Sequence, residues 1–292
     1  MRPPPILVTG MPRSGTTWLA RLLASGLRTA LPGREPMNPR GRQYALSGTL
    51  PGWVRLTQPT VQQVRILRRA YAGINPWTYS RYGHRQWIAG LPNIRCIVKD
   101  PFAMLSIPAI QRVTGARAVL VYRHPGAALA SYRRMGWTPD TEELVPIISQ
   151  FIAKYGPTDG VVLPRDGQDD VSALAWFWSA LYGMALRDTS PEAVDVVSHR
   201  DVAIGGDAAA RRLFQALELT WTSATQQLIH PSGVRAANEQ ALHNLHRDPA
   251  VVADAWRDHF ASRDVQRLDE ETAAVREALE QRSLRVSERP AP

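Results

Sequence analysis

The sequence predicts an α/β fold with three layers, in which helices cover both faces of a central parallel sheet. Short apolar runs alternate along the chain with helical patterns, which is the order typical of parallel sheets. Polar groups directly follow three regions of that pattern, at residues 10–17, 99–100 and 123–131. Because ligands bind beyond the carboxyl ends of parallel strands, these groups are expected to share one site.

The predicted strands are short, continuous apolar runs, as expected for strands that are buried on both faces. They cover residues 6–8, 94–98, 118–122 and 194–198. One helix is predicted to begin near Gly15. Further helices are predicted at residues 61–72, 101–113, 127–134, 171–187, 207–217, 250–262 and 266–280. Residues 32–60, which hold many Pro and Gly residues, and the polar residues 156–170 are predicted as loops, and the tail after Arg285 as frayed.

No internal repeat or long linker divides the chain, so residues 1–292 are expected to form a single domain. The single cysteine, Cys96, excludes an internal disulfide, and no Cys/His group has the spacing of a structural zinc site. The apolar stretch in the first ten residues is too short, and too rich in proline, for a signal peptide. The longest uncharged stretch, 171–186, is shorter than a membrane span needs. These features favour a cytoplasmic protein without a membrane span.

The chain is basic, with a formal charge of +9 carried by 33 arginines and two lysines. The excess of arginine over lysine is consistent with a GC-rich genome. The charge permits nucleic acid, a membrane surface or a small polyanion as partner. Because the arginines are scattered along the sequence, it predicts no nucleic-acid-binding face.

Residues 10–17, Gly-Met-Pro-Arg-Ser-Gly-Thr-Thr, follow a strand and open a helix. That context predicts a phosphate-binding loop, since free N–H groups and the helix dipole attract an anion there. The alternative is an ordinary glycine turn. The spacing is that of a nucleotide kinase loop, but Thr16 stands where kinases carry lysine, and the cation is Arg13, inside the loop. The fold is therefore expected to be a P-loop fold that binds one phosphate without ATP–Mg hydrolysis.

The segment from Pro12 to Trp18 resembles the 5′-phosphosulfate loop of sulfotransferases that use 3′-phosphoadenylyl sulfate (PAPS). The resemblance implies that PAPS is the sulfuryl donor, that the bisphosphate PAP is the product, and that no metal is required. It also implies that the loop residues hold the 5′-phosphate and sulfate; these are Arg13, Ser14, Gly15, Thr16 and Thr17. Trp18 would stack on the adenine, or else pack in the core.

A second anchor for the same ligand is predicted at the end of the strand 118–122. Arg123 lies at the strand tip, and Ser131 follows on the next helix. Arginine suits forked contacts to a phosphate group. In the sulfotransferase family the matching pattern, R-x-P with a serine eight residues after the arginine, binds the 3′-phosphate. The lysine–glycine motif that completes this contact in cytosolic members is not visible.

Sulfuryl transfer to a hydroxyl needs a general base and fixed cations around the reacting group. Pro101 occupies the position of the histidine base of cytosolic members, and Lys99 to Phe102 instead resemble the KDPF stretch of tyrosylprotein sulfotransferases. That group, like some bacterial carbohydrate sulfotransferases, carries a glutamate base where Glu35 lies here. Glu35 is therefore the predicted base, with Lys99 and Arg13 as catalytic cations. His84 and Asp100 remain alternative bases.

The predicted acceptor is a hydroxyl of a small molecule, lipid or glycan, bound by insertions at about 36–92 and 136–170. Aromatic residues there could form a stacking pocket or belong to the core: Trp53, Tyr71, Trp77, Tyr79, Tyr82 and Trp87. Two other functions stay open, a P-loop kinase or NTPase and a non-catalytic polyanion-binding protein. The oligomeric state also stays open.

Overall fold

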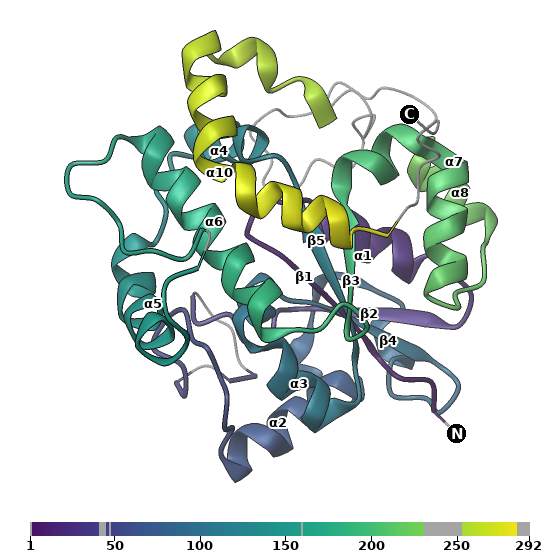
Figure 1. Ribbon diagram of the computed structural model, residues 1–292. Coiled ribbons are helices and arrows are strands. Elements are labelled where there is room, and N and C mark those ends of the chain that lie inside the picture. The colour runs from purple at the N-terminus through teal and green to yellow at the C-terminus, as the bar shows by residue number, and fades with distance from the viewer. Residues whose placement is uncertain (1, 41–44, 47, 159, 231–252, 285–292) are drawn as a thin grey trace.

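A computed structural model describes residues 2–40, 45–46, 48–158, 160–230 and 253–284. These residues contain a six-stranded sheet with the order β3-β2-β4-β1-β5-β6 (Figure 1). The strands are β1 Ile6–Thr9, β2 Thr29–Gly33, β3 Tyr79–His84, β4 Arg95–Lys99, β5 Arg117–Tyr122 and β6 Val194–Ser198. The four predicted strands are confirmed, whereas β2 and β3 were not predicted.

The sheet is parallel except at one edge. β2, β4, β1, β5 and β6 pair in parallel, and β3 runs antiparallel to β2. The prediction of a parallel sheet is thus correct for its centre and wrong for this edge. The strand β3, YSRYGH, has only half-buried and exposed positions, as expected for an edge strand that is partly solvated.

Helices cover both faces of the sheet, as predicted. They are α1 Thr16–Ala24, α2 Val61–Tyr71, α3 Ile107–Thr114, α4 Pro125–Met135, α5 Thr141–Tyr155, α6 Asp170–Asp188, α7 His199–Ala216, α8 Ser223–Ile229 and α10 Ser262–Arg282. Short 3₁₀ turns lie at Pro76–Thr78, Gln86–Ile88, Pro101–Ser106 and Arg257–His259. No helix among the described residues is long and apolar enough to cross a membrane.

The three layers follow from the alternation of side chains along the central strands. In β1, Leu7 packs into the larger core, on the side of α3 and α6, while Ile6 and Val8 pack into the core on the side of α1 and α7. All three side chains are fully buried. Because successive residues of a strand point to opposite faces, the apolar run of β1 needs apolar cover on both sides.

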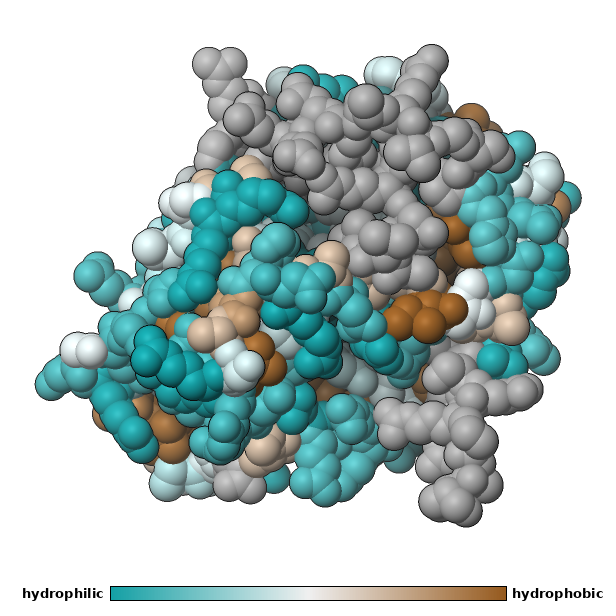
Figure 2. Space-filling view, turned by 90° about the horizontal axis from the view of Figure 1, so that it is seen from above, coloured by the Kyte–Doolittle hydropathy of each residue, from teal (hydrophilic) through white to brown (hydrophobic). Residues whose placement is uncertain are grey.

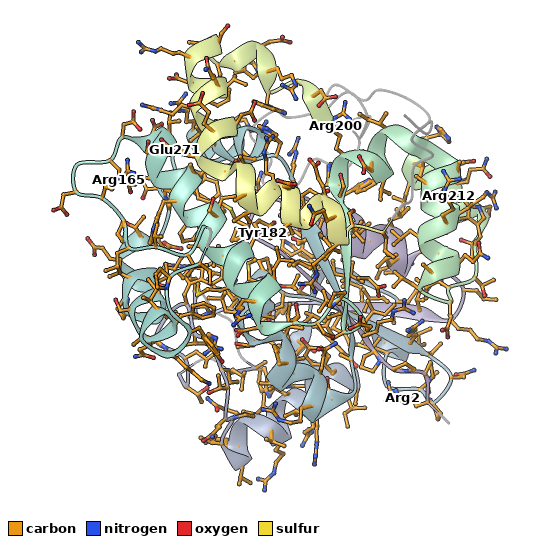
Figure 3. The ribbon with its side chains drawn as sticks, viewed as in Figure 1. Arg2, Arg165, Tyr182, Arg200, Arg212 and Glu271 are labelled. Atoms are coloured by element: carbon orange, nitrogen blue, oxygen red, sulfur yellow. The ribbon has the colours of Figure 1, made fainter. Side chains whose placement is uncertain are left out.

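Helix α6 is the central helix of the larger core, as its uncharged sequence predicted. Phe177, Trp178 and Tyr182 are each at most 1% exposed. The Tyr182 hydroxyl donates to the carbonyl of Val121 at 2.7 Å and accepts from the amide of Met11 at 3.2 Å. Tyr182 therefore joins α6 to β5 and to the loop after β1, at the centre of the molecule (Figure 3).

Several predicted boundaries need correction. Residues 101–113 form a 3₁₀ turn followed by α3. Helix α7 is broken at Gly206, which has φ 54° and ψ −139°, so the helix predicted at 207–217 is its second part, and its first part, from His199, was not predicted. The helix predicted at 250–262 is wrong after residue 254, where a 3₁₀ turn ends in extended backbone; residues 250–252 lie outside the described residues. The tail after Arg285 also lies outside them. Helices α5 and α8 were not predicted.

Candidate active site

The loop between β1 and α1 is shaped by residues in left-handed backbone conformations. Arg13 has φ 73° and Gly15 has φ 93°. A Cβ atom on Gly10 would lie 2.1 Å from the carbonyl oxygen of Val121, so glycine is required there. Gly15 is the N-cap of α1 and supplies no side-chain cap, which leaves the first N–H groups of the helix for a ligand. The loop thus has the form of an anion site.

His199, at the start of α7, lies directly behind this loop. A Cβ atom on Gly15 would come within 2.1 Å of its Cδ2 atom. The ring of Trp18 meets the His199 ring edge-on, with the centroids 5.1 Å apart. His199 is 5% exposed, and its Nδ1 atom has no hydrogen-bond partner among the described residues. His199 had no predicted functional role, yet it packs against Gly15 and Trp18 and so supports the loop.

Burial, and then the charge of Arg123, lower the pKa of His199 to about 3. An unfolded histidine titrates near pH 6.5. The neutral ring therefore stabilises the fold fully above about pH 6.5, and that contribution is lost as the pH falls toward 3.

We expect the free energy of unfolding to fall by about 3 kcal/mol between pH 7 and pH 4 through this residue alone. Urea unfolding of a His199→Gln variant over this range should show a shallower dependence on pH. His230→Gln is the control, because His230 is exposed. A pH dependence unchanged by His199→Gln would contradict this assignment.

The second predicted anchor lies beside the first. Ser131, buried on α4, accepts a hydrogen bond from Nε of Arg13 at 2.8 Å. Arg123 lies at the tip of β5, as predicted, and its pKa is lowered to about 10 by burial and then by the charges of Arg13 and Arg134. The pKa of Arg13 is lowered by burial and then by Arg134. A partly buried cluster of like charges favours binding of an anion, which offsets their repulsion.

His124 has a structural role next to Arg123. Its Nδ1 atom accepts from the amide of Gly126 and caps α4, so the proton is on Nε2, which contacts Asp269 of α10 at 2.8 Å. The ring stacks on Trp256 with the centroids 4.4 Å apart. Burial lowers the pKa of His124 to about 4, so the ring is neutral. This contact attaches α10 to the Arg123 loop.

Glu35 and Lys99 form an ion pair at the carboxyl edge of the sheet. Glu35 follows β2, and Lys99 is the last residue of the neighbouring strand β4. Lys99 Nζ donates to Glu35 Oε1, and Asn38 Nδ2 donates to Oε2. The two charged side chains are 12% and 14% exposed. The structure thus brings the predicted base and the predicted cation into direct contact.

Asp100, one of the two alternative bases, lies directly after Lys99 at the end of β4. Its carboxylate is fully buried and accepts from the amides of Met37 and Phe102. Among the described residues it forms no hydrogen bond with Lys99, although the charge of Lys99 acts on it. Burial, and then the charge of Glu35, raise the pKa of Asp100 well above its ordinary value. Asp100 therefore holds the loop that carries Glu35.

His84 is exposed on β3, opposite Leu31 of β2. Partial burial, and then the charges of Arg85 and Arg21, lower the pKa of His84. Among the described residues no hydrogen bond connects it to Glu35 or Lys99. His84 is therefore not part of the Glu35–Lys99 ion pair.

The aromatic residues considered for the acceptor pocket divide into two groups. Trp53 and Tyr71 belong to the core, with 3% and 1% exposure. Trp77 and Trp87 are 65% and 79% exposed. Trp137, which the sequence analysis did not consider, is 41% exposed, and the Arg13 guanidinium lies 5.6 Å from its ring centroid. Gly136 ends α4, so the sequence could have placed Trp137 at the start of the segment 136–170 that is predicted to bind the acceptor.

A parallel sheet with an anion loop at a helix start, and with further cations at neighbouring strand ends, is typical of proteins that bind phosphorylated ligands. The sequence model of the sulfotransferase family matches residues 4–223. The chain belongs to this family, as the resemblance implied. No curated protein matches it.

Solved structures with low sequence identity align over most of the chain. The sulfotransferase domain from the curacin biosynthetic pathway is 14% identical, covers 94% of this chain and 99% of its own, and has a TM-score of 0.49. The sulfotransferase domain from the Synechococcus PCC 7002 olefin synthase is 16% identical, with coverages of 93% and 95% and a TM-score of 0.46. A sulfotransferase from Mycobacterium tuberculosis is 16% identical, with coverages of 94% and 77% and a TM-score of 0.38.

Proposed function

We propose that this sulfotransferase moves the sulfuryl group of PAPS to a hydroxyl of a small-molecule, lipid or glycan acceptor. The observation that carries the proposal is the Glu35–Lys99 pair at the same edge of the sheet as the phosphate loop. A carboxylate can take the acceptor proton, and a lysine beside it can stabilise the negative charge that develops during transfer.

The residues of the site fit the donor. Arg13 to Thr17 would hold the 5′-phosphate and sulfate, because the helix start and the loop hydroxyls are donors for anionic oxygens. Arg123 and Ser131 would hold the 3′-phosphate. Trp18, which contacts His199 and is partly buried against the core, would stack on the adenine. When bound, PAPS supplies the sulfuryl group and a nucleotide leaving group.

Glu35 is the base in this proposal because its carboxylate is paired with Lys99 and its side chain is partly exposed. Asp100 is fully buried, and backbone amides already occupy its two oxygens. His84, on β3, is accessible, but the charges of Arg85 and Arg21 act on it. Asn38, which donates to Glu35 Oε2, orients the carboxylate so that Oε1 faces Lys99. Lys99 and Arg13 are the proposed catalytic cations.

The acceptor site is proposed to lie between residues 36–92 and 136–170. Asn38 and Trp137 come from these two segments and contact Glu35 and Arg13, respectively. Arg40 connects the segments, since its guanidinium pairs with Asp140 at 2.9 Å.

A thermal-shift comparison of PAP with ATP–Mg tests the donor assignment. We expect PAP to raise the melting temperature and ATP–Mg to leave it nearly unchanged, because Thr16 replaces the lysine that bridges the β- and γ-phosphates in kinases. Arg123→Ala should lower the affinity for PAP by about tenfold to a hundredfold.

The matched ligand is adenosine 5′-phosphate, which lacks the 3′-phosphate. Its weaker binding should be insensitive to Arg123→Ala. Selective stabilisation by ATP–Mg would favour a P-loop kinase or NTPase instead. Stabilisation by many unrelated polyanions, with no preference for PAP, would favour a non-catalytic polyanion-binding protein.

A further inference from the structure

The acidic residues of this chain are distributed unevenly. Residues 1–99 contain fifteen basic residues and one acidic residue, Glu35, whereas residues 100–292 contain twenty basic and twenty-five acidic residues. Residues 36–99 hold ten basic residues and no acidic one. The arginines are scattered along the chain, but the carboxylates that could neutralise them are missing from its first third. Such asymmetry is typical of proteins that meet a polyanionic surface.

A hydrophobic surface lies within this acid-free segment. We call it the Trp77–Trp87 surface, and it consists of Ile74, Trp77, Trp87, Ile88 and Leu91, which are 48%, 65%, 79%, 37% and 49% exposed. These residues are five of the eleven large hydrophobic side chains found exposed in the described part of the chain. Clustered exposed apolar side chains mark interaction sites more often than isolated ones.

Contacts between the two halves of this segment make the surface continuous. The ring of Tyr79, two residues after Trp77, meets the Trp87 ring edge-on at 5.3 Å between centroids. The Tyr79 hydroxyl donates to the carbonyl of Gly73 at 2.7 Å. A Cβ atom on Gly90 would lie 2.9 Å from Cγ2 of Ile74. The segments before β3 and after β3 therefore pack against each other behind the exposed side chains.

Exposed arginines lie close in sequence to the residues of the Trp77–Trp87 surface. Arg81 lies on β3 and Arg85 directly after it. Among the described residues neither forms an ion pair: Arg81 contacts the Tyr82 hydroxyl and ring, and Arg85 donates to the carbonyl of Gly26. Arg69, exposed near the end of α2, is bonded through its carbonyl to the amide of Ile74. Their charges are not neutralised by nearby carboxylates within 36–99.

The surface adjoins the edge of the proposed acceptor site. The amide of Arg34, next to Glu35, donates to the carbonyl of Thr78 at 2.9 Å. At the end of the surface near Ile88, Arg2 donates to the carbonyl of Ala89. Figure 3 shows Arg2 at the lower right edge of the molecule, far from Arg165. The face in Figure 2, seen from above, is mostly hydrophilic where its described residues are visible, with small hydrophobic patches.

We propose that the Trp77–Trp87 surface binds the interface of an anionic lipid bilayer. Tryptophan and aliphatic side chains enter the boundary between headgroups and acyl chains, and arginines beside them attract anionic lipids. Single-stranded nucleic acid would use the tryptophans and arginines but gives Ile74, Ile88 and Leu91 no partner. A symmetric contact with a second copy would bring together two segments that carry arginines and no carboxylates.

Co-sedimentation with vesicles tests this proposal. The protein should bind vesicles of phosphatidylcholine mixed with phosphatidylglycerol more tightly than pure phosphatidylcholine vesicles. The double variants Trp77→Ser/Trp87→Ser and Arg81→Glu/Arg85→Glu should each lower the apparent affinity by about tenfold or more. The matched control is Leu163→Ser/Arg165→Glu, which alters another exposed hydrophobic residue and a neighbouring exposed arginine. It should bind like the wild type.

Each of the following results would overturn the proposal: no preference for anionic vesicles, equal losses in the surface and control variants, or a change of oligomeric state in the surface variants measured by light scattering. Binding of single-stranded RNA that is lost in the surface variants, without vesicle binding, would also overturn it. Thermal stabilisation by PAP is measured on every variant. That readout reports folding and the proposed function separately from membrane binding.

Discussion

Glu35→Gln is expected to lower kcat for sulfuryl transfer by about 10²–10⁴-fold, the range over which a positioned general base contributes. The amide keeps the size of the side chain but cannot take the acceptor proton. Because Glu35 is not among the residues proposed to hold the nucleotide, the affinity for PAP should stay close to that of the wild type. Steady-state kinetics with PAPS, and calorimetric titration with PAP, measure the two quantities.

The control is Glu143→Gln, which removes a carboxylate from α5 that bonds the Trp53 amide and Arg40 rather than Lys99. It should leave most of kcat intact. If Glu35→Gln keeps wild-type turnover, Glu35 is not the base, and the role passes to His84 or Asp100. If it loses PAP affinity in proportion to kcat, its role is structural.

Lys99→Met is expected to lower kcat by about 10²–10³-fold, as loss of one fixed positive group at a developing charge does. The chain offers a matched control in its other lysine, since Lys154 lies over the ring of Tyr155, away from the sheet edge. Lys154→Met should leave kcat nearly unchanged. Equal effects of the two substitutions would contradict the assignment.

Because Lys99 and Glu35 are in contact, their effects should not multiply. The double variant Glu35→Gln/Lys99→Met should lose less activity than the product of the single losses. Fully multiplicative losses would mean that the two side chains act independently, in spite of the ion pair.

The sequence predicted the parts of the fold that depend on local apolar pattern. The runs in β1, β4, β5 and β6 are buried on both faces, so their strand character is visible from composition alone. β2 has the sequence TALPG, whose proline and glycine are typical of a loop. It is a strand because β4 and β3 pair with it on either side, and tertiary pairing overrides local preference.

For the candidate site, the sequence predicted the residues at the strand ends but not most of their contacts. The phosphate loop follows from its local pattern. The Glu35–Lys99 contact requires β2 and β4 to be neighbours, which the sequence does not encode locally, so the two roles came from the family resemblance. The position of Asp100 against the Met37 amide, and of His199 behind Gly15, depends on packing between distant segments.

The most direct test of the proposed function is transfer of labelled sulfate from PAPS to a panel of phenols, sugars and lipids, with PAP formation followed in parallel. We predict PAP formation that depends on an acceptor, label on that acceptor's hydroxyl, and loss of both in Glu35→Gln. PAP formation at the same rate in the wild type and in Glu35→Gln, or no consumption of PAPS together with Mg²⁺-dependent hydrolysis of ATP, would contradict it.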